Sequence, residues 1–346
     1  MPTTPSDASY TVGLVGAGGI ASVHLPAWLA LGVRVLVHSS VGAAELVSAT
    51  GGGVPVSSLD ELLASCDAVD ICTPTTSHAD LVSRAAAAGR HVLCEKPLAR
   101  TAAEAGRLVA TCAADGVQLY PGHVVRYFPE YAAMHAAVAA GTIGEVAVQR
   151  FSRTGSRPVA PWFSDDELSG GLVLDQAIHD LDFARWNAGE VVRVFAREVQ
   201  TPAPAGVRSA QVVLTHARGA LSYVTGTWAR QGTSFRTTFE VAGTQGLLRH
   251  DSREHAPLVI DGGVSDQAST GLLPATPFLE SPFLTEIREV YRAFRGGPPP
   301  RVSADDGWKA LRIAEAALSA LSSGRAVELE PGGGCVTGPG LGGQQR

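Results

Sequence analysis

Lys96 and the pair Asp175 and His179 have the residue types and spacing that proton transfer requires. A histidine with an ordinary pKa near ~6.5 can take a hydroxyl proton close to neutral pH. A lysine can stabilise a developing alkoxide as a cation, or act as the base itself where burial lowers its pKa. A carboxylate can orient the histidine or hold a neighbouring substrate hydroxyl. Together these groups suit the oxidation of an alcohol or the reverse reduction.

The segment Cys94-Glu95-Lys96-Pro97-Leu98 determines where Lys96 lies. The preceding run 91–93 predicts a short buried strand. Pro97 ends it, because proline lacks a backbone donor and keeps the preceding residue out of helical geometry. Lys96 therefore stands at the carboxyl end of a strand, where open α/β sheets bind ligands. The alternative is a strand-ending turn with a solvated lysine.

A predicted helix over 171–187 carries the other two candidates. Asp175 and His179 are one turn apart, so their side chains share a face. The helix is otherwise apolar, so we expect it to be largely buried and its polar groups to need partners. Asp180 and Asp182 are expected to face solvent or to be structural. The alternative for the first pair is an exposed contact worth about 0.2–0.5 kcal/mol.

The elements around these residues predict two domains. Over 10–122, strands alternate with helices, which indicates an α/β doubly wound parallel sheet. Over 123–330, strands follow strands by short turns, which indicates an α+β domain with a mainly antiparallel sheet. Its last helices, near 282–295 and 303–323, can pack back on the first domain. The polar or Gly-rich tails 1–9 and 331–346 are expected to be disordered.

The first predicted strand runs into a GxGxxA segment at residues 16–21, which opens a helix. Gly16 permits the tight turn and Gly18 lets the backbone approach a pyrophosphate, while Gly19 and Ile20 lead into the helix N-terminus with its free donors. A strand before and a helix after are the context that a dinucleotide-binding loop needs. The alternative is an ordinary Gly-rich turn.

The end of the second predicted strand bears on the choice between NAD and NADP. This strand ends in His38-Ser39-Ser40, without the acid that would bind the 2′-hydroxyl of NAD. No charge there repels a 2′-phosphate, and the hydroxyls of Ser39 and Ser40 can donate to one. We therefore favour NADP. NAD is the alternative, because no arginine stands beside the serines.

These motifs and their order resemble the Gfo/Idh/MocA oxidoreductases, the glucose–fructose oxidoreductase and inositol dehydrogenase group. The resemblance covers about residues 10–330. The matching motifs are GAGGIA at 16–21, Thr73-Pro74 with His78, CEKPLA at 94–99, Gly122-His123 with Arg126 and Pro129, GTIGE at 141–145, and Gly170-Gly171 leading into DQAIHDLD at 175–182.

The resemblance implies a Rossmann domain joined to an α+β domain whose open sheet forms the interface of a homodimer or homotetramer. It implies an NAD(P)-dependent dehydrogenase or reductase acting on a secondary alcohol or ketone of a sugar, cyclitol or sugar derivative. It also assigns Lys96, Asp175 and His179 to the substrate site, and it implies a cis Lys96–Pro97 bond.

Further candidates on the cofactor side follow from position. Thr73 and Pro74 end the fourth strand and are expected to line the nicotinamide side of the cleft. His78 begins the following helix and either binds cofactor or is only a packed histidine. Glu95 either contacts the nicotinamide ribose or counters the charge of Lys96.

Substrate contacts are expected from four residues. His123 and Arg126 follow the sixth strand at the ligand edge, although Arg126 is equally well explained by a salt bridge between domains. Trp162 can cover the nicotinamide or a sugar face, or it is a hydrophobic anchor. Gln176 stands where relatives more often carry a small or apolar residue, so it is a candidate substrate selector.

The net charge, the apolar runs and the cysteine content argue against several other classes of protein. The net charge of −6 and the absence of a basic run argue against nucleic acid as a partner. No signal peptide or apolar run long enough to cross a membrane is present, which favours a cytoplasmic protein. The five cysteines form no CxxC pair, so neither a disulfide framework nor a metal site is expected.

Two other functions fit the same residues. A regulatory sensor could keep the cofactor site without turnover, although the presence of Lys96, Asp175 and His179 argues against it. An enzyme that recycles NAD during glycosidic cleavage or elimination is the second alternative.

Overall fold

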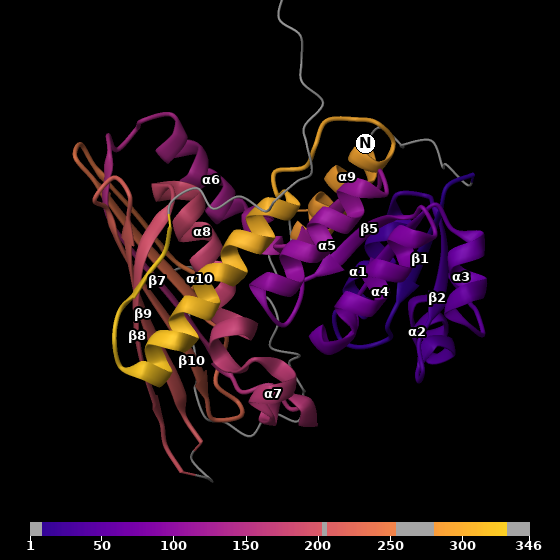
Figure 1. Cartoon of the computed structure of the whole chain (residues 1–346), viewed down its shortest axis with the longest axis horizontal. Helices are drawn as coiled ribbons and strands as arrows, with labels where there is room; N and C mark the ends of the chain where they lie inside the picture. The colour runs from indigo at the N-terminus through magenta and orange to yellow at the C-terminus, as the bar shows by residue number, and fades with distance from the viewer. Residues whose placement is uncertain (1–8, 203–205, 254–279, 331–346) are drawn as a thin grey trace, which may run out of the picture. The chain divides into compact units, whose positions relative to one another are not determined.

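The chain forms two compact units in the computed structural model, which describes residues 9–202, 206–253 and 280–330 (Figure 1). The first unit contains the described residues up to Val124 and returns with Glu280–Trp308. The second contains those from Val125 to 253 and from Lys309 onward. Except for Ser9, the tails expected to be disordered lie outside the described residues.

The first unit is built on a six-stranded parallel sheet in the order β3-β2-β1-β4-β5-β6. Apolar runs such as that of β1 are buried along their whole length, as expected for a sheet covered on both faces. The strand order reverses between β1 and β4, the position where doubly wound sheets bind ligands. The strands are β1 (Thr11–Val15), β2 (Arg34–His38), β3 (Val54–Pro55), β4 (Ala68–Ile71), β5 (His91–Glu95) and β6 (Leu119–Gly122).

Helices connect these strands, as the alternating sequence pattern predicts. Ser58 and Thr101 cap two of them, because their side chains accept hydrogen bonds from the backbone N–H three residues later. The helical segments of this part of the chain are α1 (Ala21–Ala30), α2 (Ala43–Thr50), α3 (Leu59–Ser65), η1 (Thr75–Ser77), α4 (His78–Ala87) and α5 (Ala102–Ala114).

Helix α9 (Pro282–Phe294) completes the first unit although it follows most of the second in sequence. Its Ile287, Val290 and Phe294 are buried in one apolar cluster with Tyr10 and Trp28. Helix α9 lies within the range 123–330 of the second predicted domain, and its apolar face packs against α1 of the first unit. The domain bounds expected from the sequence, including late helices that pack back on the first domain, stay a prediction.

The second unit is built on a seven-stranded sheet in the order β12-β11-β7-β10-β9-β8-β13. Strands β7 and β10 pair in parallel, and the other pairs in the described sheet are antiparallel. The predicted fold class, a Rossmann sheet plus an α+β domain with a mainly antiparallel sheet, is confirmed. The strands are β7 (Val146–Ser156), β8 (Val191–Gln200), β9 (Arg208–His216), β10 (Leu221–Ala229), β11 (Arg236–Gly243), β12 (Leu247–Asp251) and β13 (Val327–Glu328).

The helix predicted over 171–187 differs from expectation in its first turns. Residues Val173–Ala177 (η4) form a π-helical segment, and the α-helix α8 begins only at Ile178 and ends at Ala188. Both segments pack on one face of the sheet, where a Cβ added at Gly226 would lie 3.5 Å from the Leu172 side chain. The other helical segments are η2 (Val124–Tyr127), α6 (Pro129–Ala139), η3 (Pro161–Ser164), α7 (Asp166–Ser169) and α10 (Ala304–Ser323). Among the described helices, none is long and apolar enough to cross a membrane.

Two buried ion pairs anchor α8 within the second unit. Asp182 accepts hydrogen bonds from Nε and Nη2 of Arg126 at 2.7 and 2.6 Å, and Asp180 accepts from Arg153 at 2.9 and 2.8 Å. Both aspartates are only 1% exposed. Of the two expectations for Asp180 and Asp182, the structural one is therefore correct.

Glu286 of α9 is a buried acid in the first unit whose carboxyl group has no hydrogen-bond partner among the described residues. Its side chain is 1% exposed. Burial and the nearby charge of Glu95 raise the pKa of Glu286 well above its ordinary 4.5. The folded protein therefore holds this carboxyl in its neutral form.

Replacing Glu286 with glutamine is expected to stabilise the fold increasingly as pH rises. In the unfolded chain the glutamate ionises above pH ~4.5, whereas the folded form retains its proton, so wild-type stability falls by up to about 1.4 kcal/mol per pH unit in this window. Glutamine does not titrate and has the same shape. The melting temperature of Glu286→Gln should exceed that of wild type more at pH 8 than at pH 5. An equal difference at both pH values would contradict the neutral assignment.

Candidate active site

Gly16 lies where strands β1, β2 and β4 come closest together. Its φ is +114°, its backbone N–H donates to the His38 carbonyl at 2.8 Å, and an added Cβ would lie 2.5 Å from the carbonyl oxygen of Cys72. Only glycine fits this turn. The loop that follows is therefore held at the switch point of the sheet.

Gly18 and Gly19 are exposed on the next part of the loop. A Cβ added at Gly18 would meet no atom within 4 Å, so the fold itself does not require glycine there. Helix α1 begins directly afterwards, after the half-buried Ile20, without a side-chain cap. An open approach beside uncapped helix donors suits the pyrophosphate of a dinucleotide.

Ser39 and Ser40 directly follow His38, the residue of β2 whose carbonyl accepts the hydrogen bond from Gly16. Ser39 is half-buried and Ser40 is exposed, and Ser39 Oγ accepts a long hydrogen bond of 3.5 Å from the Val41 N–H. These contacts leave both hydroxyls available in the described structure for a ribose or its phosphate. Neither cofactor is selected by them alone.

His78 joins the loops that follow β4 and β5. It is fully buried, with Nδ1 2.8 Å from the Pro97 carbonyl oxygen and Nε2 2.9 Å from that of Thr73. Burial lowers the pKa of His78, while the two carbonyl contacts oppose that effect. The alternative of a packed histidine thus describes its contacts, and direct binding of cofactor by His78 stays a prediction.

Thr73 and Pro74 stand at the carboxyl end of β4, next to Gly16. Thr73 is half-buried and accepts a 2.7 Å hydrogen bond from Ser77, whereas Pro74 is exposed. A Cβ on Gly16 would lie 3.3 Å from the Thr73 side chain. The structure therefore brings the glycine loop and the end of β4 together, as the sequence predicts.

Lys96 follows β5 and is half-buried, while Glu95 before it is buried. The Lys96–Pro97 peptide bond is cis, as the resemblance implies. Glu95 Oε2 accepts a hydrogen bond of 3.0 Å from the backbone N–H of Lys96. The ammonium group is thus carried by a short segment whose backbone is held on both sides.

Asp175 and His179 are the two half-buried residues in an otherwise buried stretch of the second unit, from Gly171 to Arg185. Gln176 between them is 7% exposed, and its Oε1 has no hydrogen-bond partner among the described residues. The π-helical segment contains Asp175 and ends just before α8. Such segments are frequent at functional sites.

The other three substrate candidates are all placed in supporting contacts. His123 is buried directly after β6, and its backbone N–H donates to the Pro121 carbonyl at 2.9 Å. Trp162 is half-buried and stacks on Phe163 with ring centroids 3.7 Å apart, as a hydrophobic anchor would. A substrate contact by His123 or Trp162 stays a prediction.

For Arg126 the contacts favour a structural role over the predicted substrate contact. Its guanidinium is buried, engages Asp182 and lies 4.5 Å from the centre of the Trp186 ring. Because Asp182 belongs to the same unit, this pair is not a salt bridge between domains. Direct recognition of substrate by Arg126 stays a prediction.

Sequence reasoning missed a buried polar cluster beneath the carboxyl ends of β4 and β5. His24 of α1, Asp70 and Cys72 bring their polar atoms within 4.8 Å of one another. Cys72 reads as a small hydrophobe in its apolar run, and the helical spacing of His24 and Trp28 is the signal that could have revealed the cluster. Both of those side chains contact Asp70.

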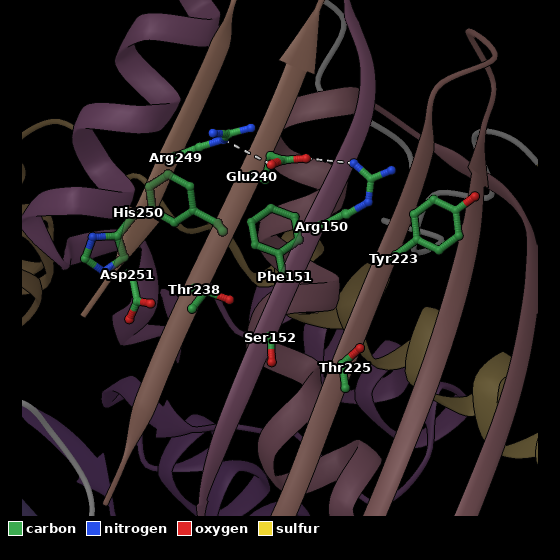
Figure 2. A pocket seen from close by; sticks show the side chains of 11 residues that line it. Arg150, Phe151, Ser152, Tyr223, Thr225, Thr238, Glu240, Arg249, His250 and Asp251 are labelled. Carbon is green, nitrogen blue, oxygen red and sulfur yellow. Dashed lines mark hydrogen bonds and ion pairs between the residues drawn. The ribbon is translucent and has the colours of Figure 1, made fainter. Parts of the chain in front are cut away.

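A shallow hollow of about 430 Å³ on the seven-stranded sheet contains none of the predicted site residues (Figure 2). Figure 2 shows Glu240 between Arg150 and Arg249, and the hydrogen bonds from these arginines measure 2.9 and 3.1 Å. Tyr223 is 39% exposed on the neighbouring strand. This charged and aromatic surface is distinct from the π-helical segment that carries Asp175.

A parallel sheet in this strand order, with a glycine loop at its switch point, is the fold of a dinucleotide-binding domain. Residues 10–123 match the description "Oxidoreductase family, NAD-binding Rossmann fold", and residues 131–249 match the GFO/IDH/MocA C-terminal domain. The chain belongs to the Gfo/Idh/MocA family, and its enzyme class is that of the NAD(P)-dependent dehydrogenases and reductases acting on CH–OH groups.

Known relatives resemble the chain over most of its length. Myo-inositol 2-dehydrogenase of Thermotoga maritima is 32% identical over 270 residues, covering 76% of this chain and 80% of the relative. D-apiose dehydrogenase of Paraburkholderia graminis is 30% identical over 348 residues, covering 95% and 92%. The crystal structure of GenD2 from gentamicin A biosynthesis, in complex with NAD, has a TM-score of 0.82 at 27% identity, covering 93% of this chain and 96% of that one.

Alanine substitutions at Gly16 and Gly18 should separate folding from cofactor binding. Gly16→Ala strains the turn by ~1–3 kcal/mol, which lowers the melting temperature by roughly 2–4 °C for each kcal/mol. Gly18→Ala should leave the melting temperature within about 1 °C of wild type but weaken NADH binding at least ~10-fold, because its methyl group meets only the ligand. Differential scanning fluorimetry and NADH fluorescence titration measure the two effects. Wild-type NADH affinity in Gly18→Ala would place the pyrophosphate elsewhere.

Proposed function

We propose that this protein transfers a hydride between a nicotinamide cofactor and the secondary alcohol or ketone of a cyclitol, sugar or sugar derivative. The names of its relatives support this substrate class, since they include a myo-inositol dehydrogenase and a D-apiose dehydrogenase. The exposure pattern of Asp175 and His179 carries the proposal for this chain. A buried stretch that, from Gly171 to Arg185, leaves only an acid and a histidine partly open suits proton transfer to a ligand.

The bound cofactor supplies the redox chemistry by accepting or donating hydride at nicotinamide C4. The description of the protein's family and the complex of GenD2 with NAD support NAD(H) as this cofactor. The sequence preference for NADP rests on the absence of a carboxylate after His38 and stays a prediction. Ser39 and Ser40 are the hydroxyls available to donate to a 2′-phosphate.

The protein's own residues would manage the proton. His179 takes the hydroxyl proton during oxidation, because its half-buried imidazole suits acid–base work near neutral pH. Lys96 holds the substrate oxygen, and its positive charge stabilises the developing alkoxide. Lys96 is also the alternative base. Asp175 orients His179 or holds a neighbouring hydroxyl.

Replacing Lys96 with methionine keeps the aliphatic stem and removes the charge, so kcat should fall at least ~10²-fold while NADH still binds. A panel of cyclitols, aldoses and keto-sugars with NAD and with NADP first identifies the substrate pair, by absorbance of reduced nicotinamide. NADH titration of the variant then separates binding from turnover. Normal turnover in Lys96→Met would contradict the proposed role of Lys96. A wild-type enzyme that oxidises or reduces none of these polyols and sugars would contradict the proposed substrate class.

We also propose that the chain forms a homodimer or homotetramer through the outer face of the seven-stranded sheet. Arg150 and Tyr223 are exposed on this face, on the neighbouring strands β7 and β10. The guanidinium of Arg150 lies 5.7 Å from the centre of the Tyr223 ring. A second copy would cover this flat surface of aromatic and paired charged side chains.

Tyr223→Glu should weaken this association, because it places an additional acid near Glu240 on the proposed interface. Light scattering after size-exclusion chromatography should show a lower mass for the variant at micromolar concentration. Leu168→Glu is the matched control, since Leu168 is similarly exposed but lies on α7. A monomeric wild type, or an unchanged mass in Tyr223→Glu, would refute the proposed interface.

A further inference from the structure

Five buried polar residues of the first unit form a cluster that includes Glu95, the residue directly before Lys96. They come from α1, β4 with the residue after it, β5 and α9, and each is at most 7% exposed. The mechanism above uses none of them for chemistry. They are His24, Asp70, Cys72, Glu95 and Glu286.

Asp70 is the anchor of this cluster, because three donors converge on its carboxylate. His24 Nδ1 lies 2.9 Å and Trp28 Nε1 lies 2.6 Å from Oδ2, while Cys72 Sγ donates to Oδ1 at 3.5 Å. These contacts fix the ring of His24 with a proton on Nδ1. The other nitrogen, Nε2, then faces away from Asp70.

His24 Nε2 faces Glu95 Oε1 at 3.4 Å. A neutral ring protonated on Nδ1 would present a lone pair to that carboxylate, which is repulsive. The imidazolium instead places a positive charge and an N–H between the two carboxylates. The contacts with two carboxylates therefore favour His24 in its charged form.

The directions of the pKa shifts agree with this arrangement. Burial opposes the charge on His24, but its contacts raise the pKa well above 6.5. Burial also raises the pKa of the Cys72 thiol, so this thiol stays neutral beside His24. Burial alone would raise the pKa of Glu95, but His24 and Lys96 lower it. Glu286, which faces the cluster from α9, stays neutral because its pKa is raised.

Glu95 transmits this interaction to Lys96. Its Oε2 accepts the 3.0 Å hydrogen bond from the Lys96 backbone, while Oε1 lies against His24 and the backbone of Gly122. A Cβ at Gly122 would come within 2.7 Å of Oε1, so glycine at the end of β6 leaves room for the carboxylate. One rotamer of Glu95 thus brings Oε1 within ion-pair distance of His24 and accepts the backbone hydrogen bond of Lys96 through Oε2.

We propose that His24 is a positioning residue for Lys96, which acts through the buried ion pair with Glu95. Without the ion pair, the Glu95 carboxylate is free to turn or to take up a proton, and it releases the backbone that carries the lysine. This inference rests on the proposed role of Lys96 in turnover. Displacing a catalytic group by about 1 Å can cost ~10²-fold in rate.

A double-mutant cycle of His24→Gln and Glu95→Gln tests the coupling in the full-length enzyme. Each single variant should lower kcat by ~10- to 100-fold with little change in the KM of the alcohol. Because the two residues act as a unit, the double variant should be no more than about threefold slower than the worse single variant. If the loss of kcat in the double variant instead equalled the product of the two single losses, the proposal would be overturned.

Two controls separate positioning from general damage to the core. Glu286→Gln lies in the same cluster but replaces a neutral acid by a neutral amide, so its kcat should match wild type. His216→Gln removes another buried histidine, which contacts Gly189 and Ser222 in the second unit, and should combine multiplicatively with Glu95→Gln. A wild-type kcat in His24→Gln, or losses in Glu286→Gln equal to those in His24→Gln, would overturn the proposal.

A measurement without turnover keeps the test independent of the proposed function. In ¹⁵N spectra of histidine-labelled enzyme, the His24 signals, assigned by their loss in His24→Gln, should show both nitrogens protonated at pH 8. Glu95→Gln should shift the titration of His24 to lower pH. A neutral His24 at pH 8, or one stoichiometric metal ion lost in both His24→Gln and Cys72→Ala, would overturn the proposal. Normal turnover in Lys96→Met, with the predicted His24 spectrum, would instead sink only the proposed function.

Discussion

The close approach of three strand ends at Gly16 is the constraint on which the ligand edge of the first unit depends. The Gly16 N–H is bonded to the end of β2, and its Cα faces the carbonyl that follows β4, so no side chain can enter. Because the chain turns so tightly there, α1 begins five residues later at Ala21. This start places His24 and Trp28, four residues apart, on the helix face that contacts Asp70.

In the second unit, ion pairs hold helix α8 in place while Asp175 and His179 remain partly exposed. Arg126 and Arg153 each form paired hydrogen bonds with an aspartate of α8, and removing one partner of such a buried pair typically costs ~3–5 kcal/mol. The arginines thus fix the register of the helix against the sheet. The positions of Asp175 and His179 on this face of the sheet therefore depend on the two ion pairs.

Local patterns in the sequence were sufficient to predict the strand–helix alternation, the glycine loop and the place of Lys96 after β5. They were insufficient for Asp180 and Asp182, because the local sequence around an aspartate does not show whether it faces water or an arginine 27 or 56 residues away in sequence. The π-helical turn was also invisible, since buried π and α turns use the same apolar residues. The cluster around His24 is formed by residues from four separate elements, and one of them, Glu286, is more than 250 residues from His24 in sequence.

The return of α9 to the first unit also determines when that unit can finish folding. Ile287, Val290 and Phe294 fill the same apolar cluster as Tyr10 and Trp28, so the earliest strands to leave the ribosome lack part of their core. At ~5–20 residues per second, α9 is complete roughly 15 to 55 seconds after β1. During that time most of the second unit is synthesised. Although it comes first in the sequence, the first unit therefore closes only after α9 has been made, and its contacts between distant parts of the chain favour slow folding.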